Sequence, residues 1–239
     1  KPEGYAHPFP DLLQGWIDTP VMNLGVQQAG LSLFAEERWL LDTASRAELT
    51  VFQVLGAQNM SNRLYSVHSR RNDRFLAVSP ALRDMYPSVD FAEVNFTGHL
   101  LDTLVTQSKA AFEVLVEELK WAWVQRMRRI VKTINGDVVL LWVADRRPED
   151  TRNTIRESEP LFVDRAMLNE LSGDVAGVVE VVGAAPASLD GKVFSAGEAE
   201  AAQSLPGPAD HARMAEALAS KISQIRRSPG EVSPARASG

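Results

Sequence analysis

Residues able to bind or activate a ligand gather directly after apolar runs of the sequence. Gly25 opens a glycine- and glutamine-rich loop, Gly56 opens a stretch that contains Asn59, and Asp145 is followed by two arginines. Glycine lets the backbone approach a ligand closely. Asparagine donates hydrogen bonds without adding charge, which suits the stabilisation of an oxyanion. These loops are the predicted ligand site.

A second candidate site is the segment 61–75, which combines basic, carboxamide and aromatic side chains. Arginine forks suit phosphate, sulfate or carboxylate. Two other interpretations stay open: the arginines hold a long loop by capping carbonyls and pairing with Asp73, Asp84 and Asp90, or they form an oligomer interface. The candidate anion-binding residues are Asn62, Arg63, His68, Arg70, Arg71 and Arg74.

The elements that position these loops are apolar runs alternating with helical patterns. The runs at 21–24, 49–55, 137–143 and 175–182 read as strands covered on both faces. Helices are expected at 9–17, 33–44, 96–105, 112–134, 166–171 and 209–225, and Asn135-Gly136 is expected to close the longest one with a left-handed residue. This alternation predicts an α/β fold with a mainly parallel sheet. Ligands of such sheets bind outside the carboxyl ends of the strands.

The organisation we predict is one α/β domain over residues 1–227. Residues 56–90 are expected to form an irregular polar insertion, and residues 228–239, rich in Pro, Ser, Gly and Ala, a disordered tail. The chain starts without an initiator Met, and we expect its first strand to be missing.

Composition narrows the function classes. A formal net charge of −6 argues against general nucleic-acid binding. The chain has no cysteine, which excludes disulfides and thiolate chemistry and fits a reducing, cytoplasmic compartment. No run approaches the roughly 20 apolar residues that span a bilayer, and the histidines show no metal spacing. We expect no cofactor, no metal, no nucleic acid and no membrane partner, with a small-molecule or carbohydrate ligand and a homo-oligomer left open.

Two strand-end motifs resemble those of the SGNH/GDSL hydrolases. Val21-Met-Asn-Leu-Gly25-Val-Gln-Gln-Ala-Gly30 is similar to the second motif block of that superfamily, and Val54-Leu-Gly56-Ala-Gln-Asn59 resembles the third, with one extra residue. The resemblance implies a three-layer, flavodoxin-like sheet, ester hydrolysis or acyl transfer, and Gly25 and Asn59 as the oxyanion donors.

The resemblance has two departures. The first block, a strand ending in Gly-Asp-Ser, is absent, and Ser61 lacks the Gly-x-Ser-x-Gly elbow. In the last block, Asp210-His211-Ala-Arg-Met-Ala215 resembles the helical part, but Leu205 stands where the catalytic histidine is expected. Leucine cannot act as a base. Either His211 serves as the base or the site is not of the Ser–His type, and a capping role at the start of its helix is the plainer interpretation.

A closer resemblance, spanning most of the chain, is to an uncharacterised alphaproteobacterial family with a domain of unknown function. It is carried by Gly56-Ala-Gln-Asn-Met-Ser-Asn-Arg63-x-Tyr65 together with the run from Arg70 to Phe75. It implies a bacterial cytoplasmic origin and no known activity. Three readings stay open: an SGNH-like enzyme of unknown substrate with an incomplete catalytic set, a non-catalytic binder of an anionic carbohydrate or nucleotide, and an assembly subunit that uses the long helix.

Overall fold

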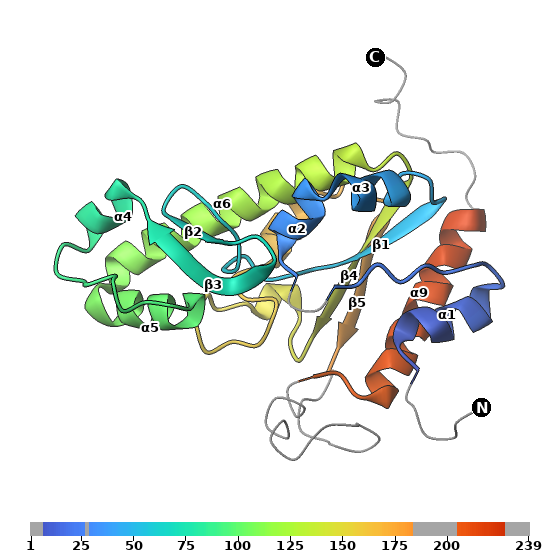
Figure 1. Ribbon diagram of the computed structural model, residues 1–239. Coiled ribbons are helices and arrows are strands. Elements are labelled where there is room, and N and C mark those ends of the chain that lie inside the picture. The colour runs from blue at the N-terminus through green and yellow to red at the C-terminus, as the bar shows by residue number, and fades with distance from the viewer. Residues whose placement is uncertain (1–6, 27–28, 184–204, 228–239) are drawn as a thin grey trace. The chain divides into compact units, whose positions relative to one another are not determined.

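The computed structural model describes residues 7–26, 29–183 and 205–227 and mixes helices with strands (Figure 1). Most of the expected helices and strands form. The elements in chain order are α1 (Phe9–Ile17), α2 (Leu31–Glu36), α3 (Arg38–Ala44), β1 (Leu49–Gln53), β2 (Tyr65–His68), β3 (Arg71–Val78), α4 (Pro80–Met85), α5 (Thr97–Gln107), α6 (Lys109–Thr133), β4 (Asp137–Ala144), a 3₁₀ turn (Pro148–Asp150), α7 (Arg165–Glu170), β5 (Gly177–Val182) and α9 (Pro208–Arg227).

Three strands form an open parallel sheet in the order β1-β4-β5, and β2 and β3 form a separate antiparallel pair. This confirms the α/β class and the parallel sheet built from the apolar runs after residue 48. The central strand β4 is buried along almost its whole length, which explains its unbroken apolar sequence.

The strand predicted at 21–24 is wrong, because these residues are coil. Met22 is 71% exposed, whereas Leu24 packs against a small apolar cluster of Ala29, Leu33 and Leu40. A short coil segment that buries one apolar side chain, here Leu24, cannot be told from a short strand by its sequence pattern.

The segment 56–90, predicted to be irregular, is instead largely ordered. Tyr65, Val67 and Phe75 place their side chains on the buried side of the β2–β3 hairpin, where Tyr65 lies opposite Val78. Helix α4 follows at once. It begins at Pro80, and the Ser79 hydroxyl accepts a hydrogen bond from a backbone N–H in its first turn.

The prediction that Gly136 is a left-handed cap is also wrong. Helix α6 ends at Thr133, and Ile134 turns the chain into extended backbone. Gly136 is needed for a different reason. A Cβ atom there would lie 2.5 Å from the carbonyl oxygen of Ala47, so only glycine allows the two backbones to come this close.

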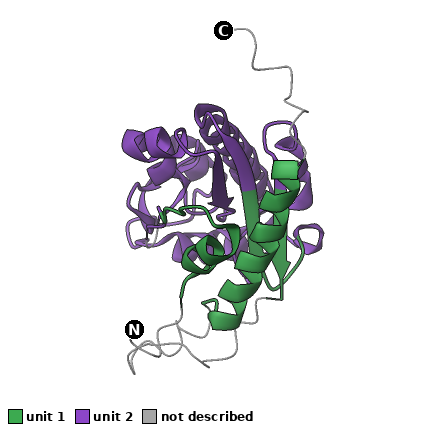
Figure 2. Cartoon of the chain, turned by 90° about the vertical axis from the view of Figure 1, so that its right-hand side faces the viewer, with its two compact units in different colours: residues 1–23, 140–147, 178–239 green, residues 24–139, 148–177 purple. Residues whose placement is uncertain are grey.

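The chain divides into two compact units (Figure 2). Unit 1 comprises residues 1–23, 140–147 and 178–239, and within it α1 packs against α9. Unit 2 comprises residues 24–139 and 148–177, and within it α6 packs against α2, α5 and α7. A single domain over 1–227 stays a prediction, and the tail predicted at 228–239 lies outside the described residues.

The core of unit 2 forms along α6. Trp123 is wholly buried, and its indole N–H donates to the carbonyl of Leu55 at 2.8 Å. Phe112 meets Phe162 edge to face with ring centroids 6.0 Å apart. Within the described ranges, no helix has the length and apolar character needed to cross a membrane.

Candidate functional site

The loop of residues 56–59, which follows β1 in unit 2, is the best-anchored candidate site in the structure. The Ala57 amide donates to the carbonyl of Leu161 at 2.9 Å. The hydroxyl of the buried Tyr65 donates to the carbonyl of Gln58 at 2.5 Å, and burial raises the pKa of this phenol well above its ordinary value. The loop is thus fixed on two sides, by Tyr65 a few residues later and by Leu161, which is distant in the sequence.

Glu159 places its carboxylate directly over the backbone of Gly56. Its Oε1 accepts a hydrogen bond from the Gln58 amide, and its Oε2 accepts the Leu161 N–H at 3.0 Å. A Cβ atom on Gly56 would lie 2.2 Å from Gln58 Oε1 and 2.3 Å from Glu159 Oε2. Gln58 is only 5% exposed, and its Oε1 is buried without a hydrogen-bond partner, whereas Glu159 is exposed. The arrangement presents an oriented carboxylate to solvent at the end of β1.

Asn59, the next residue, is oriented by helix α5. The hydroxyl of Thr97, a residue only 2% exposed, donates to Asn59 Oδ1 and also lies 3.4 Å from the carbonyl oxygen of Asp73. Since Oδ1 faces Thr97, the amide nitrogen Nδ2 is the group that can donate to a ligand. One carboxylate oxygen of Asp73, whose carbonyl contacts the Thr97 hydroxyl, is buried without a hydrogen-bond partner. Asn59 itself is partly exposed, so a ligand can reach it.

The glycine-rich loop predicted to lie beside Asn59 does so through Gly30. A Cβ atom on Gly30 would stand 2.7 Å from the Asn59 carbonyl oxygen and 2.8 Å from Cβ of Asn72. Only glycine permits this close packing of the Gly30 backbone against Asn59 and Asn72. Gly25 is exposed in the coil ahead of α2. The structure therefore brings together the Gly30 end of the first loop and Asn59.

Asn62 and Arg63 are both engaged in holding the protein together. Asn62 Oδ1 accepts the backbone N–H groups of Leu64 and Tyr65 at 2.8 and 3.1 Å, which shapes the turn into β2. Arg63 donates to both oxygens of Glu118, a residue 8% exposed, and its guanidinium lies 5.0 Å from the ring centroid of Trp121. The hydrogen bond and the charge of Glu118 raise the pKa of Arg63.

The remaining anion-binding candidates lie on the β2–β3 hairpin. His68 Nδ1 accepts the backbone N–H groups of Arg70 and Arg71, both at 3.2 Å, and so closes the hairpin turn. Arg70 pairs with Glu37 at 2.7 Å. Arg71 and Arg74 are exposed on β3. The loop-holding interpretation thus describes several of these residues, although the partners are not the aspartates expected from the sequence.

Ser61 is also occupied structurally. Its hydroxyl accepts the Val67 N–H at 3.0 Å and lies 3.3 Å from the Val67 carbonyl oxygen. Its own carbonyl accepts from Arg126, which also reaches the Ser32 hydroxyl at 3.0 Å. Burial lowers the pKa of Arg126, opposed by the charge of Glu36. Ser61 ties β2 to α6 and is not poised as a nucleophile.

His211 lies near the start of α9, in unit 1. Its Nδ1 accepts the backbone N–H of Phe9 at 3.4 Å, and its ring stacks on the Phe9 ring at 6.3 Å. Burial lowers the pKa of His211, opposed by the neighbouring charge of Asp210. The imidazole therefore favours its neutral form. Because Nδ1 accepts the Phe9 N–H, the ring proton is on Nε2, and Nδ1 is the nitrogen that can take up a further proton.

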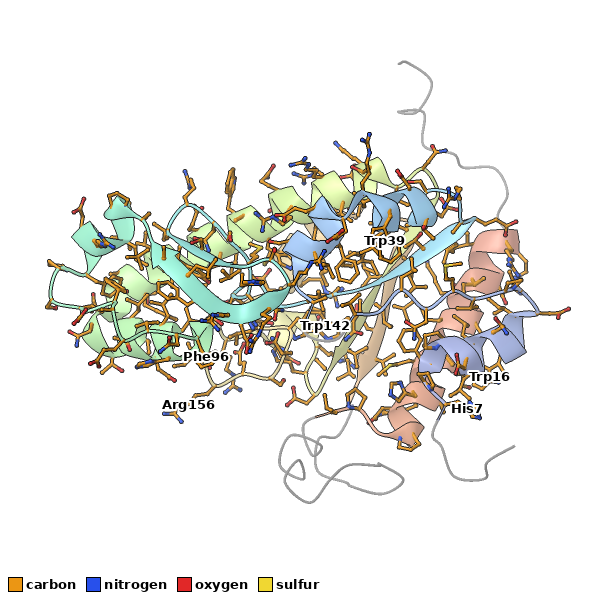
Figure 3. All side chains as sticks on the ribbon, in the orientation of Figure 1. His7, Trp16, Trp39, Phe96, Trp142 and Arg156 are labelled. Atoms are coloured by element: carbon orange, nitrogen blue, oxygen red, sulfur yellow. The ribbon has the colours of Figure 1, made fainter. Side chains whose placement is uncertain are left out.

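Sequence reasoning missed Gln58, Thr97 and Glu159. Gln58 and Thr97 are ordinary polar residues in the sequence, and Glu159 is more than 100 positions from Gly56. Gly56 gave an indirect signal, because a glycine next to a strand indicates that another group packs closely against the backbone at that position. Figure 3 shows the side chains of the described residues as sticks on the ribbon.

The described ranges contain no group of three His, Asp or Glu side chains arranged to hold a metal ion. The site consists instead of neutral carboxamides with one carboxylate, Glu159. Such a set can donate to a carbonyl or oxyanion through Asn59 and accept from a hydroxyl through Glu159.

Comparison with known proteins gives one match. The model of a family described as a domain of unknown function (DUF6473) matches residues 4–226, nearly the whole chain. A search of the curated proteins and a search of the solved structures found no match to this chain.

Proposed function

The chain belongs to the DUF6473 family of domains of unknown function, and we propose that it is an SGNH-hydrolase-like ester hydrolase or acyl transferase of the bacterial cytoplasm. In this proposal the acyl carbonyl of a small ester binds at the end of β1, and Nδ2 of Asn59 stabilises the oxyanion that forms when the carbonyl is attacked. A three-layer, flavodoxin-like arrangement of the sheet is part of the same proposal.

The observation that carries the proposal is the orientation of the Asn59 carboxamide. The buried Thr97 hydroxyl holds its oxygen, so its nitrogen is directed before any ligand arrives. An oxyanion donor that needs no reorganisation at the moment of reaction is what lowers the barrier to acyl transfer. The motif resemblance names Gly25 as the second donor, and Gly30, the last glycine of the same motif, lies close to the Asn59 carbonyl oxygen.

His211 enters the proposal through its protonation state alone. Burial lowers the pKa of its imidazole, so at pH 7 the neutral form prevails, which a general base requires.

Hydrolysis of p-nitrophenyl acetate and labelling by a fluorophosphonate test the proposal. We expect Asn59→Ala to lower kcat about 10²- to 10³-fold, as the removal of an oxyanion donor does. Thr97→Val should lower it roughly tenfold, because the carboxamide is retained but free to rotate. Thr103→Val is the matched control, since it removes a hydroxyl from the same helix that bonds only to the carbonyl of His99. A full-length protein inert to both reagents, or a full-length Asn59→Ala variant as active as its parent, would contradict the proposal.

The alternative function, binding of an anionic carbohydrate or nucleotide, is favoured by the exposure of Arg71 and Arg74 on β3. Its test is thermal stabilisation by sulfate or phosphate. Stabilisation that disappears in Arg70→Ala with Arg71→Ala would support the binder, and a parent protein that neither anion stabilises would refute it.

A further inference from the structure

The second half of β3 is an apolar strand edge that is covered only in part. Residues 71–74 of this strand are polar or charged, whereas residues 75–78 read Phe-Leu-Ala-Val. Leu76 is 53% exposed. Edge strands are normally protected from pairing with other chains by lysine, proline, a bulge or a covering segment. The apolar half of β3 carries neither a charge nor a proline, and its protection is limited to one irregular position in the pairing with β2, at Leu76.

Residues 95 and 96 cover the start of this edge through a single bridge, and the rest of the edge is not paired with them. Arg74 pairs with Phe96 in an isolated bridge, and the Phe75 amide donates to the carbonyl of Asn95 at 3.0 Å. Beyond that point a groove of about 410 Å³ opens, lined on one side by residues 75–78 and on the other by parts of 83–92. Successive side chains of a strand point to opposite faces. A groove lined by four consecutive residues therefore runs along the strand edge.

We propose that this groove is where a second copy of the chain docks, edge to edge, through β3. The groove carries charges of both signs, which favours a second copy of the chain as its partner. Arg83 and Asp90 are both exposed and line the groove. A twofold axis brings the same surface of two copies together, so that residue i of one copy meets residue j of the other and the reverse. The basic and acidic residues of one copy then meet the acidic and basic residues of its partner.

Phe96 extends the apolar part of the same surface. It is 50% exposed and forms the bridge with Arg74, two residues before Leu76. Figure 3 shows its side chain beside β3. Pairing of two β3 edges would join two hairpins into one four-stranded antiparallel sheet, and the backbone hydrogen bonds of the new ladder would be shielded by Leu76 and Phe96 of both copies. The inference does not depend on the proposed enzymatic function.

Sedimentation velocity from about 1 to about 100 µM protein, a range that covers weak and moderate homodimers, tests the inference. We expect the parent chain to dimerise and Leu76→Lys to be monomeric throughout. Val114→Lys is the matched control, because Val114 is 60% exposed on α6 and does not line the groove, and this variant should dimerise like the parent. Circular dichroism and thermal melting check that every variant is folded.

Charge reversal makes the test specific for the twofold arrangement. Arg83→Asp and Asp90→Arg should each weaken dimerisation roughly tenfold, because each turns two symmetry-related attractions into repulsions. The double variant should recover parental affinity to within about threefold.

Three outcomes would overturn the inference: a parent that stays monomeric, a dimer that Leu76→Lys leaves intact, or a double reversal no tighter than the single ones. A monomer that instead binds an extended peptide along β3 belongs to the first outcome and would assign the groove to a different partner.

Discussion

Replacing Gly56 by alanine tests the packing of the candidate site directly. The backbone of Gly56 does not adopt a positive φ, so alanine can take the same backbone conformation. The added methyl group, however, would lie 2.2 Å from Gln58 Oε1, 2.3 Å from Glu159 Oε2 and 2.9 Å from the Leu161 amide nitrogen. The two side chains must separate, and the Leu161 backbone leaves little room for the methyl group to move away.

The expected loss of stability follows from the bonds that are broken. The hydrogen bond from Gln58 to Glu159 is partly solvated, so its loss costs about 1 kcal/mol, and leaving the buried Gln58 amide without a partner costs roughly 1–3 kcal/mol more. Alanine restricts the unfolded chain, which offsets about 0.4–1 kcal/mol. The net destabilisation is about 2 kcal/mol, or roughly 6 °C in Tm for a unit of this size.

Urea unfolding followed by tryptophan fluorescence and circular dichroism measures the effect as a shift in midpoint at constant slope. Gly98→Ala is the control, because nothing lies within 4 Å of a Cβ atom at that position of α5. It should raise stability by up to about 1 kcal/mol, as alanine does in a helix. In a Glu159→Ala background the cost of Gly56→Ala should fall to about 1 kcal/mol. If Gly56→Ala were as stable as Gly98→Ala, the close approach of Glu159 would be refuted.

Three further predictions follow from single contacts. Tyr65→Phe should cost about 1–2 kcal/mol in urea unfolding, because the buried carbonyl of Gln58 loses its donor; an unchanged midpoint would contradict this. Arg63→Ala should destabilise the protein by leaving the buried Glu118 carboxylate unpaired, and Glu118→Leu in the same background should restore part of the loss, which a double-mutant cycle measures. The folded-state pKa of His211 lies below its unfolded value, so its contribution to stability is complete above about pH 6.5 and is lost as the pH falls through the folded pKa. Melting temperatures between about pH 8 and pH 5 should therefore fall more steeply for the parent than for His211→Asn, and equal slopes would refute the assignment.

The regular elements of this chain were predictable where burial dictates the sequence pattern. β4 is buried on both faces and reads as an unbroken apolar run, and α6 repeats its buried residues at helical spacing, as at Leu115, Leu119 and Trp123. The hairpin was not predicted. Its buried residues Tyr65, Val67 and Phe75 stand among arginines and serines, and its register contains irregular positions that disturb the alternation.

The candidate site was predictable in part. Asn59 could be named because glycine and a carboxamide after a strand suit a ligand site. Its partner Thr97 and the neighbouring Glu159 could not be, because contacts between residues 38 and 101 positions apart depend on tertiary packing that no local pattern encodes. The arginines of the 61–75 segment were ambiguous for a related reason. Whether a guanidinium is free for a ligand or neutralised by a carboxylate such as Glu118 depends on the residues opposite it.

The division of the chain into units affects the order in which it can fold during synthesis. All residues of unit 2 have been made once Gly177 has been added, whereas α1 finds its partner only when α9, about 200 residues later, has left the ribosome. Until then the apolar side of α1, with Leu13, lacks the helix it packs against in the folded protein. During synthesis α1 therefore lacks its helical partner until α9 has emerged, which makes α1 a natural place for a chaperone to bind.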